Sequence, residues 1–231
     1  MKKLIGTIVI AMLLIMPLIV SIPVSVSAQP TMKLSDAVGG GTGGTFYLNP
    51  NILYTGGVTI TGDTRIYGQG AMIDLQWESI KVTGTYLYIE RCVLTNGTDG
   101  GTDYYGALEF YDDASGFVYN NIIVDSDYDG IHIEDCDKYE IIIKENSILY
   151  SSEAGIYFED STDITILENI IKNNNYGIDG DNKDLMYDGD WLPEVNELHN
   201  ILIKGNNIGV NYYENIYLEY VNGISIASNL I

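Results

Sequence analysis

Short runs of aliphatic and β-branched residues recur along the chain, and Asn, Asp, Gly and Ser separate them. Apolar residues at every second position indicate strands with one buried face, and the polar clusters between them indicate turns. The clearest repeat aligns residues 155–169 with residues 215–229, and residues 107–121 have the same length. Residues 130–146 form a fourth copy that is two residues longer. The pattern therefore predicts a chain built from repeated strand units.

An asparagine marks the same point of each repeat, mostly 23 or 25 residues from the next one. Apolar residues lie five and three positions before it and two positions after it, and only Gly116 breaks this rule. Inward residues two apart place one strand face in a core, and stacked Asn side chains can bond along the stack. The pattern predicts an all-β, single-stranded parallel β-helix of about seven coils. A β-sandwich, the alternative, predicts no fixed corner asparagine. The predicted ladder consists of Asn121, Asn146, Asn169, Asn206 and Asn229, with Cys92 in the equivalent earlier place.

Two motifs carry a resemblance to a known group of proteins. The repeats open with Gly130-Ile-His-Ile or Gly155-Ile-Tyr-Phe and end with Ile-x-Ile-x-x-Asn-x-Ile. These motifs resemble the right-handed parallel β-helix proteins of pectin-lyase-like fold and the short repeats of NosD-type proteins. The resemblance covers roughly residues 45–231 and implies a right-handed solenoid. It implies no single activity, because lyases, hydrolases, esterases and binding proteins all share this fold.

The N-terminus predicts export. Met1-Lys2-Lys3 is basic, Leu4–Val20 is almost wholly apolar, and Val26–Ala28 supplies small residues for cleavage. An uncleaved membrane anchor is the alternative, since the apolar run is about as long as a membrane span. We expect a secreted or cell-surface protein with no membrane contact after cleavage. The expected division is a signal peptide at 1–28, a Gly-rich linker or cap at 29–44, and the β-helix at 45–231. A projecting loop is expected at 181–198, because Asn169 and Asn206 are 37 residues apart.

The composition limits the classes of molecule that the protein can bind. The chain has 32 acidic and 11 basic side chains and a formal net charge of −21. Nucleic acid and anionic membrane surfaces are excluded as partners, because both are bound through basic patches. Cations, neutral glycans and basic surfaces remain as candidate partners. The 19 tyrosines, against 4 Phe and 2 Trp, add ring faces on which sugars can stack.

The outward position of the Gly-Ile-x-Ile strands places Glu109, His132, Tyr157, Asp179 and Tyr217 in one column. Adjacent members of such a column lie about 4.8 Å apart. Tyrosine faces can stack on sugar rings, and carboxylates can bind hydroxyls or act as acid and base. We expect Glu109 and His132 to share a proton. The alternative is a solvated face without a ligand. The candidate catalytic residues are Glu109, His132 and Asp129, and the candidate substrate-binding residues are Tyr157, Glu109, His132, Glu134 and Trp191.

Two acidic motifs are candidates for Ca²⁺. The first motif is Asp127-x-Asp129-Gly130. The second, Asp188-Gly-Asp190, lies in the expected loop. Neither pair matches EF-hand spacing, and ordinary turn chemistry is the alternative. Copper fits badly, because the His, Cys and Met residues are scattered.

The catalytic motifs of the resembled families are mostly missing. Asp127-Tyr-Asp-Gly-Ile-His132 resembles a polygalacturonase stretch, but the next coil offers Ser152-Glu153-Ala154 in place of an Asp-Asp pair. Pectate-lyase chemistry needs a catalytic Arg or Lys. Arg65 and Arg91 are the only arginines, and Arg91 lies next to the ladder corner at Cys92, away from the acidic face. We therefore expect a polysaccharide-binding or structural protein. The alternatives are a polysaccharide lyase or glycoside hydrolase, and a scaffold or adhesin that docks a subunit or cap through its open C-terminal coil.

Overall fold

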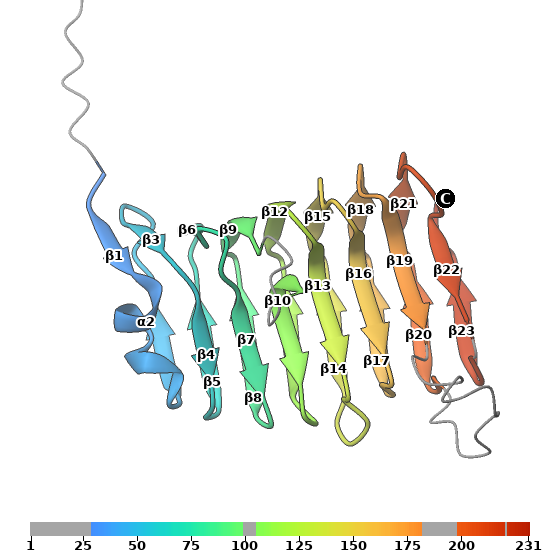
Figure 1. The fold of residues 1–231 in the computed structure, drawn as a ribbon, viewed down its shortest axis with the longest axis horizontal. Coiled ribbons are helices and arrows are strands. Elements are labelled where there is room, and N and C mark those ends of the chain that lie inside the picture. The colour runs from blue at the N-terminus through green and yellow to red at the C-terminus, as the bar shows by residue number, and fades with distance from the viewer. Residues whose placement is uncertain (1–28, 99–104, 182–197, 220) are drawn as a thin grey trace, which may run out of the picture.

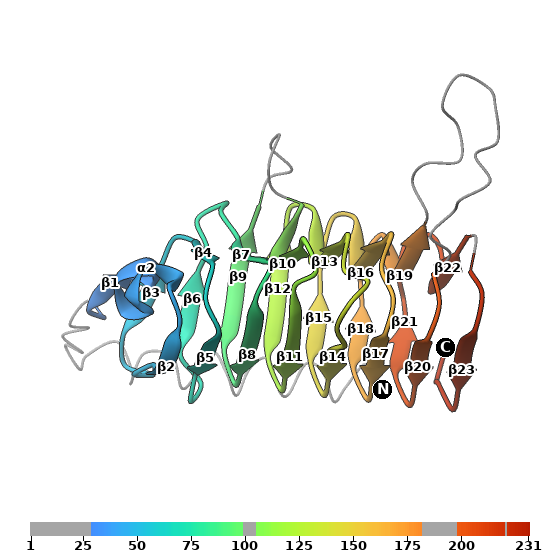
Figure 2. The same ribbon diagram turned by 90° about the horizontal axis from the view of Figure 1, so that it is seen from below.

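The computed structural model describes residues 29–98, 105–181, 198–219 and 221–231. These residues form a solenoid of successive coils, and each coil gives one strand to each of three parallel sheets (Figure 1). Seen from the side, the strands of each sheet lie side by side along the length of the molecule (Figure 2). The expected all-β parallel β-helix is confirmed. Among the described residues, no helix is both long and apolar enough to cross a membrane.

The strands alternate among the sheets in chain order. Sheet A contains β1 (Thr31–Lys33), β3 (Leu53–Thr55), β6 (Met72–Asp74), β9 (Val93–Gly97), β12 (Ile122–Ser126), β15 (Ser147–Leu149), β18 (Ile170–Lys172) and β21 (Asn207–Gly209). Sheet B contains β2 (Gly44–Tyr47), β5 (Thr64–Tyr67), β8 (Tyr86–Glu90), β11 (Ser115–Tyr119), β14 (Ile141–Lys144), β17 (Ile164–Leu167), β20 (Ile201–Lys204) and β23 (Ile224–Ala227). Sheet C contains β4 (Val58–Ile60), β7 (Ile80–Thr83), β10 (Gly106–Tyr111), β13 (Asp129–Glu134), β16 (Ala154–Glu159), β19 (Tyr176–Asp181) and β22 (Ile216–Leu218).

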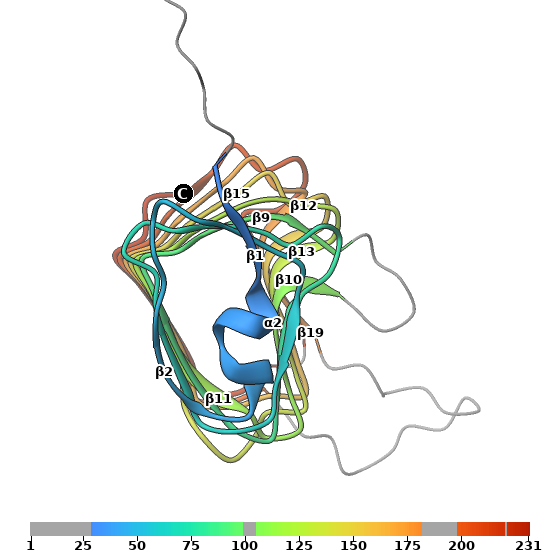
Figure 3. The same cartoon turned by 90° about the vertical axis from the view of Figure 1, so that its left-hand side faces the viewer.

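The N-terminal segment of the described chain closes one end of the solenoid. Strand β1 pairs with β3, and the short helix α2 (Leu34–Ala37) and the 3₁₀ turn η1 (Gly39–Gly41) follow it. Figure 3 looks along the coils and shows α2 across their opening. Leu34 and Val38 are fully buried in the core. These two side chains thus cover apolar side chains that the first coil would otherwise expose to water.

Aliphatic side chains from all three sheets fill the interior. Alternate residues of a strand point to opposite faces, so Ile141 and Ile143 of β14 are fully buried while Ile142 is half-buried. Phe110 and Phe158 are the largest of the fully buried side chains. Each coil buries its inner face only when a neighbouring coil covers it, so the core is continuous along the stack.

A row of hydrogen-bonded asparagines occupies the corner between sheets B and A. The Nδ2 of each member donates to the Oδ1 of the next at 3.0 or 3.1 Å, through Asn121, Asn146, Asn169, Asn206 and Asn229. Each Oδ1 also accepts a backbone N–H from the preceding coil, and that of Asn121 serves the N–H of Cys92 at 2.9 Å. The 37-residue gap between Asn169 and Asn206 leaves the row uninterrupted.

The turn at this corner needs a residue in the left-handed backbone conformation. The residue before each ladder asparagine has a positive φ, for example 57° at Glu145, 56° at Glu168 and 69° at Gly205. This conformation is unfavourable for most L-residues, so the hydrogen bonds of the ladder offset a local cost. A shorter row of Ser151, Asn174 and Asn211 lies at the corner between sheets A and C.

Candidate functional site

A cleft of about 330 Å³ lies over sheet C, at β13, β16 and β19. Tyr105, Tyr128 and Tyr157 line it together with His132 and Ala154. Five carboxylates complete the lining, and no described Lys or Arg takes part: Asp129, Glu134, Glu153, Glu159 and Asp179. The cleft is therefore strongly negative and partly walled by aromatic rings.

Strand register brings the outward column together. Glu109 pairs with His132, His132 with Tyr157, and Tyr157 with Asp179. Tyr217 follows Asp179 on the last strand of the sheet. The column runs along the solenoid, so residues that are 22 to 38 positions apart in sequence lie on adjacent strands. The Gly-Ile-x-Ile pattern produces this arrangement, because it fixes the same outward position in each coil.

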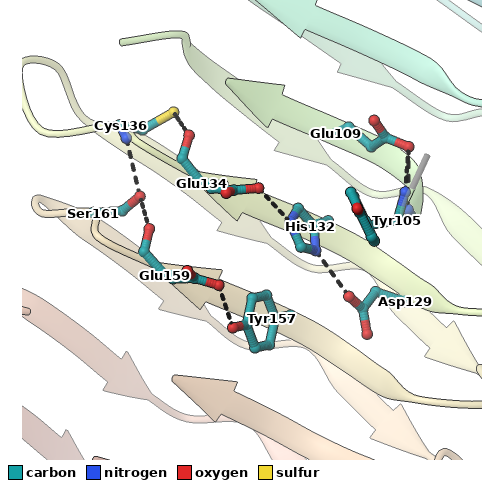
Figure 4. Close-up of polar contacts among 10 residues, drawn as sticks. Tyr105, Glu109, Asp129, His132, Glu134, Cys136, Tyr157, Glu159 and Ser161 are labelled. Atoms are coloured by element: carbon teal, nitrogen blue, oxygen red, sulfur yellow. Dashed lines mark hydrogen bonds and ion pairs between the residues drawn. The ribbon is translucent and has the colours of Figure 1, made fainter. Parts of the chain in front are cut away.

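His132 lies at the centre of a buried polar cluster (Figure 4). Its Nδ1 lies 2.9 Å from Oδ2 of Asp129, and its Nε2 lies 3.4 Å from Oε2 of Glu134. His132 is 4% exposed and Asp129 is 2% exposed. The other oxygen of Asp129 accepts the backbone N–H of Ala154 at 2.8 Å. Asp129 therefore fixes the imidazole and also ties β13 to β16.

The cluster keeps His132 protonated at neutral pH. Burial alone would lower its pKa, but the hydrogen bonds and charges of Asp129 and Glu134 outweigh burial and raise the pKa to about 9. Burial raises the pKa of Asp129 to about 6 despite the opposing contribution of His132. At pH 7 the pair is therefore an imidazolium and a carboxylate.

Rings cover both faces of this imidazole. Tyr157 stacks on it with ring centroids 4.9 Å apart, and Tyr105 stacks on it at 5.3 Å. The hydroxyl of Tyr157 donates to Oε2 of Glu159 at 2.5 Å (Figure 4). Burial and this carboxylate raise the pKa of Tyr157, so the phenol stays neutral. Tyr105, Tyr157 and His132 thus form one fixed stack of three rings.

Glu109 lies beside His132 but has other partners. Its side chain is 0% exposed, and its Oε1 accepts the N–H groups of Tyr105 at 2.9 Å and Gly106 at 3.2 Å. Burial raises the pKa of Glu109, against these amides and the charge of Lys81. The expected sharing of a proton between Glu109 and His132 is replaced by the pairing of His132 with Asp129 and Glu134. Glu109 therefore supports the start of its strand and does not line the cleft.

Asp179 is the cleft carboxylate most affected by its neighbours. It is half-buried, and burial raises its pKa to about 7, with further upward contributions from the charges of Asp129, Asp181, Glu219 and Glu153. A carboxylate in such surroundings binds a proton or another cation more readily than one in water.

Several cleft residues could not be assigned from spacing alone. Tyr105 and Tyr128 precede their strands, where the repeat does not fix side-chain direction. Glu134 and Glu159 each come two residues after a member of the outward column, His132 or Tyr157, and they are register partners. This shared spacing is the one signal that could have identified Glu159. Trp191, Asp188 and Asp190 lie outside the described residues.

The described residues offer no group of three or more His, Cys, Asp or Glu side chains that could hold a metal ion. Asp127 is exposed, and Asp129 already binds His132 and the N–H of Ala154. The suggested Ca²⁺ pair at Asp127 and Asp129 thus gains no further ligand from the described part of the chain.

Solved structures share this fold at low sequence identity. The periplasmic alginate epimerase AlgG matches with 15% identity and a TM-score of 0.53, over 81% of this chain and 51% of that one. A variant of AlgG matches with 14% identity and a TM-score of 0.53, over 87% and 55%. The A-module of the Azotobacter vinelandii mannuronan C-5 epimerase AlgE4 matches with 12% identity and a TM-score of 0.44, over 80% and 71%. The chain spans about half the length of the AlgG structure.

No curated protein matches the sequence. A family model described as right handed beta helix region matches residues 47–185, which is more than half of the chain. The three parallel sheets agree with that match. The chain belongs to the right-handed β-helix family.

Proposed function

We propose that this chain is an exported protein that binds polysaccharide in the cleft over sheet C. The observation that carries the proposal is the stack of Tyr105, His132 and Tyr157, which lies in the wall of a cleft lined with hydrogen-bond acceptors. Sugar rings stack on aromatic faces, and a few placed polar groups orient their hydroxyls. AlgG, which has a similar fold, acts on a polysaccharide in the periplasm. The basic and apolar N-terminus supports export in this chain as well.

The state of His132 favours binding over catalysis. A general base needs a neutral imidazole with an accessible nitrogen. Both ring nitrogens of His132 face carboxylates, both ring faces lie against tyrosines, and its pKa is raised to about 9. The imidazolium therefore holds two cleft carboxylates in place and is poorly suited to accept a proton from a substrate.

A panel of neutral, cationic and anionic oligosaccharides, screened by calorimetry, tests the proposal. We expect binding that Tyr157→Ala weakens about tenfold, the loss typical of one ring-stacking contact. Tyr139→Ala is the matched control, because Tyr139 is 61% exposed and lies outside the cleft. Equal affinities of wild type and Tyr157→Ala for every bound oligosaccharide, or no binding at all, would reject the proposal.

The same incubations separate binding from catalysis. We expect each oligosaccharide to be recovered unchanged in length and composition by mass spectrometry and NMR. Cleaved or epimerised products that disappear with His132→Gln would instead favour the carbohydrate-active enzyme.

A further inference from the structure

The outward column of sheet C is interrupted by a short side chain. His132 on β13 and Tyr157 on β16 carry rings, Asp179 on β19 carries none, and Tyr217 on β22 carries a ring again. Neighbouring strands lie about 4.8 Å apart, so the two tyrosine positions are separated by roughly 9.6 Å. A group above Asp179 would lie one strand spacing, about 4.8 Å, from the strand position of Tyr157, and a cation interacts with an aromatic face within roughly 6 Å.

The position above Asp179, between Tyr157 and Tyr217, is called the gap here. Both tyrosines beside the gap are held in place. The hydroxyl of Tyr157 donates to Glu159 at 2.5 Å, and the hydroxyl of Tyr217 donates to Glu219. Tyr157 shows one stacked neighbour among the described rings, His132, which lies on the side away from β19. Figure 4 shows the rings of Tyr105, His132 and Tyr157. The stack of described rings ends at Tyr157, and Asp179 is the register partner of Tyr157 on the next strand.

The charges around the gap are unbalanced. Of the cleft residues only His132 is basic, and it already pairs with Asp129 and Glu134. The cleft lining places no described Lys or Arg beside Asp179 or Glu153. The raised pKa of Asp179 reports the same imbalance, since burial and four neighbouring carboxylates disfavour its charged form. A cation placed there would stabilise the ionised cleft.

We propose that the cleft recognises a polysaccharide of amino sugars with free, protonated amines, in which one sugar ring stacks on Tyr157 and its ammonium group faces Asp179. This inference rests on the proposed function and specifies its substrate class. The amine donates charge-assisted hydrogen bonds to carboxylates and interacts with the neighbouring ring face. A polysaccharide of uronic acids is excluded from the gap, because its carboxylates would meet like charges.

Oligomers of glucosamine and of N-acetylglucosamine, matched in length, test the inference. The two share a backbone, and acetylation replaces the charged amine with a neutral amide that carries an acetyl group. At about pH 6 the free amines carry protons, and an ammonium group beside Asp179 favours the ionised carboxylate, so Asp179 releases its proton on binding. We expect the free amine to bind at least tenfold more tightly than the acetylated oligomer. Asp179→Asn should remove most of this difference. Glu168→Gln removes one carboxylate from the corner between sheets B and A, outside the cleft, and should leave it unchanged.

Each other result has a defined meaning. Equal binding of the two oligomers, dependent on Tyr157, would overturn the amino-sugar inference and leave polysaccharide binding intact. Binding that Glu168→Gln weakens as much as Asp179→Asn would overturn it as well, because the attraction would then come from the net charge. Spermidine binding as tight as that of the glucosamine oligomer would show that the sugar ring is not recognised. Failure of the whole oligosaccharide panel would reject both the inference and the proposed function.

Discussion

At the residue scale, buried polar side chains are hydrogen-bonded either to the same residue type on the neighbouring coil or to a residue of a different type. Asn169 illustrates the first case, since its Nδ2 donates to Asn206 and to the carbonyl of Ile143, and its Oδ1 accepts from Asn146. His132 illustrates the second case, with carboxylates at both nitrogens. An unpaired polar group at either place would cost more than the hydrogen bond contributes, because water cannot replace the lost partner.

Asn169→Leu tests the first case. The change removes four hydrogen bonds of the Asn169 side chain. The buried backbone N–H of Asn146 loses its acceptor, and the carbonyl of Ile143 loses a donor. We expect a loss of about 1–3 kcal/mol in unfolding free energy, which corresponds to a fall in Tm of roughly 3–10 °C. Thermal denaturation followed by circular dichroism measures it. Asn51→Leu, at an exposed position, is the control and should leave Tm nearly unchanged. A similar Tm for wild type and Asn169→Leu would contradict the role of the ladder.

At the element scale, the glycines that open the strands of sheet C have a physical cause. A Cβ at Gly155 would lie 2.8 Å from the carbonyl oxygen of Gly177, and a Cβ at Gly177 would lie 2.3 Å from that of Asn215. Successive coils approach closely at the corner between sheets A and C, and only a residue without a side chain fits between them. The same corner leads into the cleft, since β16 and β19 begin there.

Gly177→Ala tests this packing. The added methyl group meets a backbone oxygen that is fixed by the sheet, so we expect a loss of about 1–3 kcal/mol in stability. Gly209→Ala is the matched control, because Gly209 also lies in a strand and a Cβ there meets nothing within 4 Å. Urea denaturation of the two variants compares them directly. Equal midpoints would show that the corner can move apart, against the close approach described here.

The sequence predicted the coils better than the cleft. The constant spacing around Asn121 to Asn229 and the outward column from Glu109 to Tyr217 predicted which residues lie side by side, because strand register follows from the repeat. The partners of His132 and the burial of Glu109 did not follow from it. Asp129 is the first residue of β13, and Tyr105 comes just before β10. Rotamers and irregular connections, which have no period, decide where their side chains point.

At the scale of the whole molecule, part of the negative charge lies where it weakens the folded state. The net charge is −21, and cleft carboxylates are buried beside one another. The pKa of Asp129 is raised to about 6, that of Asp179 to about 7, and that of Glu109 also upward, with burial as the first cause in each case. The pKa of His132 is raised to about 9 as well. All four groups bind protons more tightly in the folded chain than in the unfolded one.

This difference predicts that the protein is most stable in mild acid. A group whose pKa is raised on folding stabilises the native state below its unfolded pKa, and that contribution is lost as pH rises through the folded value. For Asp129 and Asp179 the loss runs from about pH 4 to about pH 7, and for His132 it runs from about pH 6.5 to about pH 9. We therefore expect Tm to fall steadily between about pH 5 and about pH 9.

Asp179→Asn identifies the contribution of the cleft to this fall. The amide cannot ionise, so the variant should match wild type near pH 5 and exceed it near pH 8.5 by roughly 2–4 °C, the reduced effect expected for a partly solvated group. Glu168→Gln removes the same charge outside the cleft and should follow the wild-type curve closely. A Tm that is constant or rises between pH 5 and 8.5 would contradict the raised pKa values. If the Tm curve of Asp179→Asn ran parallel to that of wild type, folding would not raise the pKa of Asp179. The uncompensated negative charge that an amine is proposed to neutralise would then be absent.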